Sequence, residues 1–248
     1  MDLRIIEESK PDDPYLNLAK DETLLTKINS HPDTCIMRCW INTPSIVLGN
    51  SQEVMEEINI NYCLNNNISI ARRITGGGAV YHDPGNLNVS FTLPRSILPK
   101  TTEIRQINRF CTSLLIYGLK DAGYKDIELN GSTNILYKGK KISGSAGSHK
   151  SMAILHHATL LFNADLEKLN HALKACIIQG ETSSGSKYYP TINLPNFNFN
   201  TWLHVMKNVL EREINVHSIE EKLSKEEERK AHELSNSKYK KRSWIWKR

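Results

Sequence analysis

Short apolar segments of two kinds alternate along this chain, and this alternation limits the fold more than any other feature of the sequence. Hydrophobic residues at every second position predict strands, whereas hydrophobic residues three and four positions apart predict helices. The two kinds of segment follow one another without an internal repeat or a convincing linker. The pattern predicts a single α+β domain over residues 1–248, with a mixed β-sheet flanked by helices.

The expected strands and helices can be placed approximately. The expected strands cover residues 36–41, 46–48, 68–71, 87–92, 135–137 and 155–162, and the expected helices cover residues 16–28, 104–115, 166–175, 202–210 and 220–233. Strand 87–92 alternates apolar with polar residues, which predicts that only one of its faces is buried. The charge-dense helix 220–233 is expected to be a solvated surface helix. Residues 179–187 are expected to form a polar loop.

Composition excludes several classes of protein. A chain of 248 residues with 39% hydrophobic residues can bury a substantial core, and it is neither collagen-like nor wholly disordered. Its apolar runs fall short of the roughly 20 residues that cross a bilayer, and its polar start lacks the apolar region of a signal peptide. We therefore expect a cytoplasmic protein that is not bound to a membrane.

The five cysteines are odd in number and widely scattered, which argues against a disulfide framework. His31, Cys35 and Cys39 suggest a metal site at first sight. However, Cys35, Met37 and Cys39 alternate like one buried face of a strand, and zinc sites usually need a second pair of ligands. Structural cysteines are the favoured interpretation.

The net charge of +5 comes from the C-terminal end. Residues 238–248 contain six basic residues and no acidic one, so the rest of the chain carries −1. Such a tail is usually a solvated end, although it could contact nucleic acid or an acidic protein. Because no known nucleic-acid-binding motif is present, we do not expect a nucleic-acid partner.

Three consecutive glycines stand at the centre of the most informative segment, Arg72-Arg73-Ile74-Thr75-Gly76-Gly77-Gly78-Ala79-Val80-Tyr81-His82-Asp83. Glycines bring backbone N–H groups against an anion with no Cβ in the way. The two arginines add positive charge and planar donor groups that suit a phosphate or carboxylate. Three glycines alone would indicate only a flexible turn, but the flanking strand, arginines and histidine favour an anion site.

A second glycine segment covers residues 140–151 and begins with Lys140 and Lys141. It is not a phosphate-binding P-loop, because His149 stands where that motif requires glycine before its lysine. The lysine pair is instead expected at the end of a hairpin through Gly139. The adjacent histidines 156 and 157 must face opposite sides of their strand, so they cannot easily hold one metal together.

Three blocks of this sequence together resemble the signature blocks of lipoate–protein ligases. They are residues 72–86, residues 140–146 (Lys-Lys-Ile-Ser-Gly-Ser-Ala) and residues 156–166 (His-His-Ala-Thr-Leu-Leu-Phe-Asn-Ala-Asp-Leu). Supporting blocks agree in order and spacing: Asn17-Leu18-Ala19, Cys39-Trp40 and Ser243-Trp244-Ile245-Trp246. The resemblance covers nearly the whole chain.

This resemblance implies a biotin/lipoate ligase-like (class II synthetase-like) catalytic domain and a reaction in two steps. Lipoate and ATP, with Mg2+, give lipoyl-AMP, and the lipoyl group then passes to a lysine of a carrier domain of the 2-oxoacid dehydrogenase E2 or glycine cleavage H type. No tightly bound prosthetic group is implied. Lys141 and Arg73 take the catalytic roles. The implied adenylate pocket is lined by Trp40, Arg73, Thr75, Gly76, Gly77, Gly78, Val80, Tyr81, His82, Asn86, Asn134, Lys141, Ala146, His157 and Ala158.

The chain departs from the family pattern in two places. Family members commonly carry Asn-Asp upstream of the lysine block, whereas this chain has Thr133-Asn134, so Asn134 can offer Mg2+ an oxygen but no negative charge. Many members also have a small second domain after the Trp-x-Trp block, and this chain stops two residues beyond Trp246. A separate accessory subunit is one explanation, and an enzyme that works without that domain is the other.

Two other functions remain open from the sequence. The first is an ATP-independent octanoyl or lipoyl carrier-protein transferase that uses Cys176 as nucleophile, assisted by Lys141. Against it, Cys176 lacks the flanking motif of those enzymes and lies in an apolar helix end, where a structural cysteine is expected. The second is a non-catalytic scaffold that binds lipoylated proteins. Only Asn134 favours it.

Overall fold

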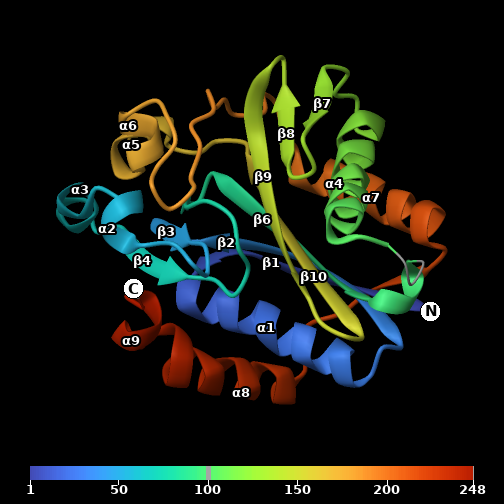
Figure 1. The fold of residues 1–248 in the computed structure, drawn as a ribbon. Helices are drawn as coiled ribbons and strands as arrows, with labels where there is room; N and C mark the ends of the chain where they lie inside the picture. The colour runs from blue at the N-terminus through green and yellow to red at the C-terminus, as the bar shows by residue number, and fades with distance from the viewer. Residues whose placement is uncertain (99–101, 248) are drawn as a thin grey trace.

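The computed structural model describes residues 1–98 and 102–247. Its framework is an eight-stranded sheet in the order β11-β1-β2-β6-β10-β9-β8-β7 (Figure 1). β1 pairs in parallel with β11 and β2, and the pairs from β2 to β7 are antiparallel, so the sheet is mixed as the sequence predicts. In the order of the sheet, the strands are His217–Glu220, Asp2–Asp12, Thr34–Asn42, Asn86–Pro94, Ala153–Leu161, Lys140–His149, Asn134–Tyr137 and Ile127–Asn130.

A smaller, three-stranded sheet has the order β4-β3-β5. β3 (Ser45–Leu48) pairs in parallel with β4 (Ser69–Arg72) and antiparallel with β5 (Val80–His82). The turn after β2 therefore joins strands of two different sheets, and the glycine segment is the connection from β4 to β5. The short helices packed around this sheet are α2 (Val54–Glu57), α3 (Ile60–Asn65), α5 (Leu166–Ala172) and α6 (Lys174–Ile177). The helix expected over residues 166–175 is thus interrupted at Leu173.

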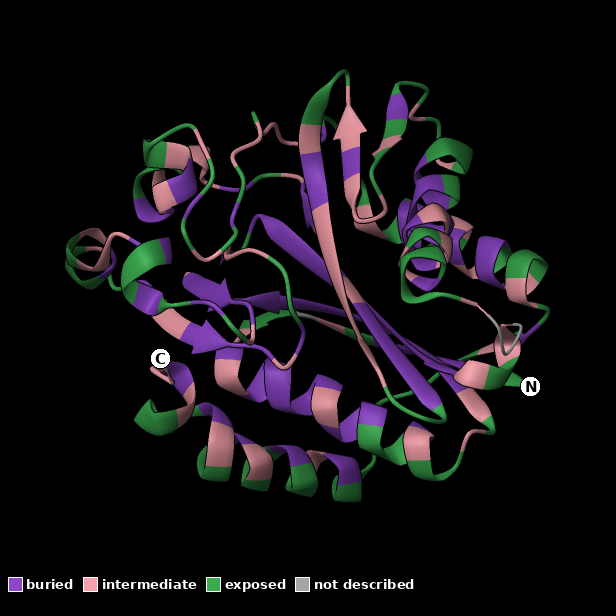
Figure 2. Cartoon of the chain, viewed as in Figure 1, coloured by how far each residue is buried: buried purple, intermediate pink, exposed green. Residues whose placement is uncertain are grey.

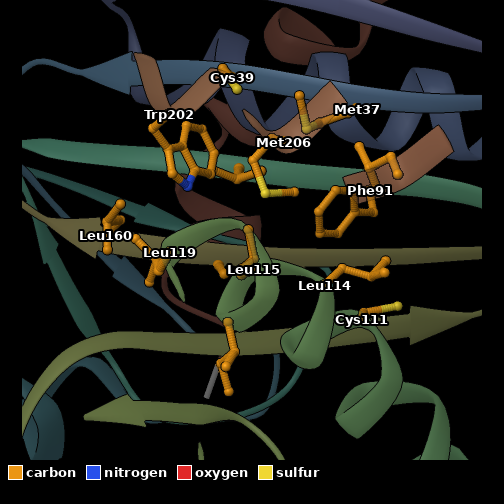
Figure 3. Packing of buried hydrophobic residues seen from close by; sticks show 14 of the residues in the cluster. Met37, Cys39, Phe91, Cys111, Leu114, Leu115, Leu119, Leu160, Trp202 and Met206 are labelled. Atoms are coloured by element: carbon orange, nitrogen blue, oxygen red, sulfur yellow. The ribbon is translucent and has the colours of Figure 1, made fainter. Parts of the chain in front are cut away.

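The central strands supply two cores because successive residues point to opposite faces of the sheet. Cys35, Met37 and Cys39 of β2 face α4 (Ile104–Asp121) and α7 (Phe199–Ile214). Figure 3 shows how the sulfur atoms of this strand lie among the large side chains of the two helices and β6. The predicted buried face of β2 is confirmed. Every helix in the described part of the chain is too short or too polar to traverse a lipid bilayer.

The opposite face is covered by α1 (Pro14–Ser30), whose N-terminus is capped by Asp13. This helix makes one prediction wrong: β6 is buried on both faces, not on one. Asn88, Ser90 and Thr92 are at most 2% exposed. The polar face of β6 lies beneath α1, where the Ser90 hydroxyl donates to Asp21 Oδ2 at 2.7 Å. The alternation of apolar and polar residues predicts the strand. It does not reveal that the polar face of the strand packs against polar residues of a helix.

The charge-dense segment also differs from its prediction. Residues 217–220 form β11, and the helix, α8 (Lys225–Leu234), begins five residues later than expected. It packs on α1 and is therefore not wholly solvated, as the buried and exposed residues alternating along it show (Figure 2). Glu227 on its inner face is 4% exposed and pairs with Arg4 and Lys27.

Residues 238–247, the described part of the basic segment, are not a solvated end, contrary to the expectation from the sequence. Lys238 pairs with Glu22 of α1, and the Arg72 guanidinium donates to the Ile245 carbonyl at 2.7 and 2.9 Å. The segment thus packs along α1 and the small sheet (Figure 1). The remaining short helices are η1 (Arg95–Ile97), η2 (Ser235–Tyr239) and α9 (Arg242–Ile245).

Candidate active site

One cavity of 290 Å3 collects most of the residues that the sequence predicts for a ligand site. It lies where the glycine segment meets β9, β10 and the loop that follows α6. The residues that line it are Leu18, Trp40, Val47, Arg73, Gly77, Gly78, Ala79, Val80, His82, Asn88, Thr133, Asn134, Lys141, Gly144, Ser145, Ala146, His157, Ala158, Thr159, Gly185, Ser186, Lys187 and Tyr189.

The walls of this first cavity differ in chemistry. Leu18, Trp40 and Val47 belong to one hydrophobic cluster contributed by α1, β2 and β3, and Val80 packs against them. The Trp40 indole N–H is satisfied inside the protein by the Ser90 hydroxyl at 2.9 Å, so its ring faces the cavity as an apolar surface. Lysine, asparagine and glycine line the wall formed by β8 and β9. The cavity therefore suits a ligand with an apolar chain and an anionic end.

Arg73 holds the glycine segment in place through its whole guanidinium. Its Nη2 donates to the carbonyls of Gly76 and Gly78 at 2.6 and 2.8 Å, its Nη1 donates to Val47 O, and its Nε donates to Thr75 Oγ1. Burial, with the charge of Arg72 beside it, lowers the pKa of Arg73 to about 10, so it remains a cation at neutral pH. Arg73 thus shapes the site and adds a positive charge to the cavity wall.

Arg72 does not share this role, which corrects the prediction that both arginines supply charge to one anion site. Its buried guanidinium donates to the carbonyls of Gly49 and Gln52 on one side and of Ile245 on the other. Arg72 is the last residue of β4 and Arg73 follows it directly. Side chains of adjacent residues in extended backbone point in opposite directions, so only one of the pair faces the cavity. Arg72 instead fastens the C-terminal segment to the loop after β3.

Close packing excludes side chains at one glycine of the glycine segment, Gly78, and at Gly49, which contacts the segment. A Cβ on Gly78 would lie 2.9 Å from Ser186 Oγ, and a Cβ on Gly49 would lie 2.0 Å from the Gly77 carbonyl oxygen. Gly77 also has a φ of +85°, which glycine adopts without strain. Ser186 completes the packing, because its hydroxyl accepts from the Ala79 N–H at 2.9 Å and from the Gln52 amide at 3.0 Å.

Lys141 lines the cavity and Lys140 is exposed, as their positions in the sequence block predict. The hairpin between β8 and β9 turns at Lys138 and Gly139, both with positive φ, and a register shift follows on β9. The Lys141 ammonium lies 5.1 Å from the centre of the Tyr189 ring. Burial lowers its pKa to about 8, with a further lowering from Arg73 that the nearby Cys176 opposes.

This buried ammonium has a measurable cost in stability. The pKa of Lys141 is about 8 in the folded protein, against 10.5 for an ordinary lysine, so its protonated form destabilises the folded state. This destabilisation is complete below pH 8 and disappears as the pH rises toward 10.5. We expect Lys141→Met to raise the free energy of unfolding by roughly 2 kcal/mol at pH 7, and by less at pH 9.5. Urea unfolding of both proteins at the two pH values measures this. Equal stability at pH 7 would contradict the buried ammonium.

His157 and His82 line the cavity, and in each of them a neighbouring side chain fixes which ring nitrogen carries the proton. His157 Nδ1 lies 3.3 Å from the carboxylate oxygen Asp21 Oδ2, so the ring proton is on Nδ1. The other ring nitrogen, Nε2, accepts from the Thr75 hydroxyl at 2.7 Å. The adjacent His156 lies on the other side of β10, as expected for neighbouring strand residues. It is wholly buried in the protein interior and does not face solvent.

His82 presents a free donor to the cavity. The Asn42 amide donates to its Nδ1 at 3.0 Å, so the ring proton is on Nε2. That nitrogen is buried and has no hydrogen-bond partner within residues 1–98 and 102–247. Burial, together with the charge of Arg73, lowers the pKa of His82 to about 3, so the ring stays neutral. It can therefore donate one hydrogen bond to a bound ligand.

The structure separates the predicted pocket residues into groups. Eleven of them line the first cavity: Trp40, Arg73, Gly77, Gly78, Val80, His82, Asn134, Lys141, Ala146, His157 and Ala158. Thr75 and Asn86 are buried behind its wall, and Gly76 is exposed with its carbonyl turned to Arg73. The sequence did not indicate Ser186, Lys187 and Tyr189, which come from the polar loop after α6.

A second, smaller cavity of 70 Å3 adjoins the first. Tyr81 and the half-buried Cys176 line it, and Lys141 lines both cavities. Burial raises the pKa of the Cys176 thiol, although the positive charge of Lys141 opposes this shift. The thiol and the ammonium thus lie on one cavity, which the sequence alone does not reveal.

Fold and site together define a catalytic domain with a glycine-lined, cationic cavity for a chain with an anionic end. The family described as lipoyl protein ligase A/B catalytic domain matches residues 13–187. Lipoate–protein ligase 1 of Staphylococcus aureus is 32% identical over 98% of this chain and 73% of its own length. This chain belongs to the lipoyl protein ligase A/B catalytic-domain family, which confirms the resemblance seen in the sequence.

Solved structures agree with this assignment. Lipoate–protein ligase A bound with ATP has a TM-score of 0.84 and 26% identity over 99% of both chains. A Thermoplasma acidophilum protein, described as a lipoate protein ligase and holding lipoic acid, has a TM-score of 0.83 and 27% identity over 99% of this chain and all of its own. The predicted fold is confirmed. The matched part covers about half of the ligases of Bacillus subtilis (49%) and Psychrobacter cryohalolentis (48%).

Proposed function

We propose that residues 1–248 act as one catalytic domain that converts lipoate and ATP to lipoyl-AMP and passes the lipoyl group to a lysine of a carrier domain. The observation that carries the proposal is the first cavity, in which an apolar wall from Leu18, Trp40 and Val47 stands with a glycine segment and the Lys141 ammonium. Lipoate has an apolar chain with a dithiolane at one end and a carboxylate at the other. The carboxylate would lie at Lys141 and the chain along the apolar wall.

The chemistry needs positive charge more than it needs a nucleophile. A carboxylate oxygen of lipoate attacks the α-phosphorus of ATP, and the bond to pyrophosphate breaks. The carrier lysine amine then attacks the acyl carbon, AMP leaves, and the amine loses a proton. Negative charge grows on the bridging oxygen in the first step and on AMP in the second, and Lys141 and the Arg73 charge stabilise it.

Magnesium enters this proposal as part of the ATP substrate. A resident Mg2+ site usually has one or two carboxylates, but of the described residues that line the first cavity none is an aspartate or glutamate. Asn134 offers one neutral amide oxygen close to Lys141. The residues present do not form a magnesium site of their own, so the ion would be held mainly by phosphates and water.

The acceptor is proposed from the resemblance of the sequence blocks, and the accessory subunit from the name of a relative. One similar protein of Thermoplasma acidophilum is a lipoate-protein ligase A subunit 1, 35% identical over 70% of this chain. We propose a lipoyl domain of the E2 type or an H-type protein as the acceptor, and a separate small subunit that assists the formation of the adenylate. We also propose that the reaction takes place in the cytoplasm.

Exchange of labelled pyrophosphate into ATP tests the proposed reaction. Exchange that depends on added lipoate is expected, and a small accessory subunit should increase it. Transfer of octanoyl or lipoyl groups between carriers with no exchange under either condition would indicate the transferase. Binding of a lipoylated protein with neither exchange nor transfer would indicate the scaffold.

The transferase has one structural observation in its favour, the shared cavity of Cys176 and Lys141. We nevertheless expect Cys176→Ser to retain carrier lipoylation within about threefold of the wild type, because the proposed route has no thioester on the enzyme and serine has nearly the same shape as cysteine. Carrier modification followed by intact-protein mass spectrometry measures this. An acyl group trapped on Cys176, with activity lost in the serine variant, would support the transferase instead.

A further inference from the structure

The buried ammonium of Lys141 has no polar partner in the protein. Within residues 1–98 and 102–247 it forms neither an ion pair nor a hydrogen bond, although it lines both cavities. It lies against Gly144, where an added Cβ would come 2.9 Å from the Lys141 Nζ. A buried charge without a polar partner is costly, so another kind of contact must stabilise this one.

The charged and titratable groups around Lys141 do not supply a counter-charge. Glu57 of α2 lines the second cavity, but its Oε1 accepts from the hydroxyls of Thr182 and Ser184 at 2.6 and 2.5 Å. No ion pair joins it to Lys141 in the described residues. The other titratable groups that line the two cavities carry no negative charge at neutral pH: Arg73, Tyr81, His82, His157, Cys176, Lys187 and Tyr189.

The aromatic ring of Tyr189 is the group that faces the ammonium. Lys141 Nζ lies over this ring at 5.1 Å from its centre, within the range of about 6 Å for a cation–π contact. The electron-rich face attracts the cation and leaves the N–H donors of the ammonium available. A carboxylate at this position would pair with Lys141 and compete with an anionic substrate for it.

Backbone hydrogen bonds fix Tyr189 opposite Lys141. The Lys141 N–H donates to the Pro190 carbonyl at 2.8 Å, and the Ile192 N–H donates to the Lys141 carbonyl at 3.1 Å. The segment that follows Tyr189 therefore runs beside β9 at the residue that carries the ammonium. The ring is held where the cation lies, and its place does not depend on a bound ligand.

We propose that Tyr189 is a positioning residue for Lys141: the face of its ring holds the ammonium in the wall shared by the two cavities and stabilises its charge. The effect on rate rests on the proposed function, to which this inference adds a residue that acts through Lys141. In both half-reactions negative charge grows beside the ammonium, so a loosely held Lys141 should lower kcat more than it raises KM.

A purely space-filling role for Tyr189 is the competing explanation. A residue that only fills the wall between the cavities acts through its size and shape, whereas a cation–π contact depends on the electron density of the ring. Fluorine atoms on a phenylalanine ring withdraw this density and change its size little. A series of phenylalanines with one, two and three fluorine atoms at position 189 therefore separates the two roles.

The first experiment measures transfer from supplied lipoyl-AMP to a carrier domain. Tyr189→Phe should keep kcat within about threefold of the wild type, and Tyr189→Leu should lower it by about tenfold while KM changes less than about threefold. Each added fluorine should lower kcat further toward the value of Tyr189→Leu. An equal kcat across the fluorinated series would overturn the inference.

The neighbouring tyrosine provides the matched control for this series. Tyr188 is not among the described residues that line either cavity. Tyr188→Leu should therefore keep kcat within about threefold of the wild type. A loss equal to that of Tyr189→Leu would mean that the segment needs aromatic residues for its packing and not for Lys141.

The second experiment does not depend on activity. Urea unfolding at pH 7 without substrate compares the wild type with Tyr189→Leu, Lys141→Met and the double variant. We expect Tyr189→Leu to lower the folding equilibrium constant by about tenfold more in the wild-type background than in the Lys141→Met background. Equal effects in the two backgrounds would show that the ring does not stabilise the ammonium.

The outcomes separate this inference from the proposed function. Absence of transfer and of lipoate-dependent pyrophosphate exchange in the wild type, with and without an accessory subunit, overturns the proposed function. The unfolding comparison still decides whether ring and ammonium are coupled. Normal transfer by the wild type without such coupling overturns only the role of Tyr189. If Tyr189→Leu does not fold, the fluorinated series decides, because it keeps the shape of the ring.

Discussion

Lys141→Ala is expected to slow both half-reactions by on the order of 100-fold or more, because losing one preorganised donor at a developing charge typically costs about 3 kcal/mol. Lys141 lines both cavities, and its ammonium is buried where the carboxylate and phosphate are proposed to meet. The protein should stay folded, since the substitution removes a buried charge. Pyrophosphate exchange measures the first half-reaction, and transfer from supplied lipoyl-AMP measures the second.

The neighbouring lysine provides the control for this variant. Lys140 is exposed on the same hairpin, so Lys140→Ala should change either rate by less than about threefold. A severe loss in Lys140→Ala would mean that the register of the hairpin is wrong. Normal transfer by Lys141→Ala would show that Lys141 does not act in the second step.

Arg73→Lys is expected to reduce adenylate formation by about 100-fold and to lower the free energy of unfolding by roughly 2 to 4 kcal/mol, since hydrogen bonds from a charged donor contribute about 1.5 to 3 kcal/mol each. The guanidinium serves the carbonyls of Val47, Gly76 and Gly78 at once. A lysine keeps the charge but cannot reach three such acceptors in one plane. The glycine segment should therefore lose its shape.

Two measurements on Arg73→Lys distinguish shape from charge. Thermal unfolding reports the loss of the hydrogen bonds, and the dissociation constant for a non-hydrolysable lipoyl-adenylate analogue reports the loss of the binding surface. We expect both to change together. If the variant binds the analogue as the wild type does, positive charge alone is sufficient at this position and the carbonyl contacts are incidental.

Much of the fold could be predicted from the sequence because local periodicity decides it. The alternation of Cys35, Met37 and Cys39 predicts the buried face of β2 directly. The apolar spacing over residues 16–28 predicts α1, which covers Pro14–Ser30. The glycine segment and Lys141 could also be located from the sequence. Glycines next to arginine indicate a tight loop beside a positive charge, and the glycine before Lys140 and Lys141 indicates the turn of a hairpin.

The features that could not be predicted depend on contacts between distant segments. The burial of Ser90 follows from Asp21, which lies on a helix 69 residues earlier in the chain. Arg72 and Arg73 look equivalent in sequence, and only the sheet decides which of them faces the cavity. Glu57 looks like an ordinary surface glutamate until the loop with Thr182 covers it.

The same reason explains why the cavity was only partly anticipated. Ser186 and Lys187 lie in a polar loop without periodicity, and hydrogen bonds to Gln52 and the glycine segment bring Ser186 to the site. Cys176 ends a short helix, and its nearness to Lys141 depends on how the small sheet packs against the large one. The local sequence pattern does not predict such packing between distant segments.

The most direct test of the account is transfer from pre-made lipoyl-AMP to a lipoyl carrier domain, with this chain as the only enzyme and with neither ATP nor free lipoate present. Intact-protein mass spectrometry follows the carrier and the enzyme together. The account predicts that the acceptor lysine of the carrier gains one lipoyl group, while the enzyme, including Cys176, gains none. An unmodified carrier, or a lipoyl group that accumulates on Cys176 before it reaches the carrier, would contradict it.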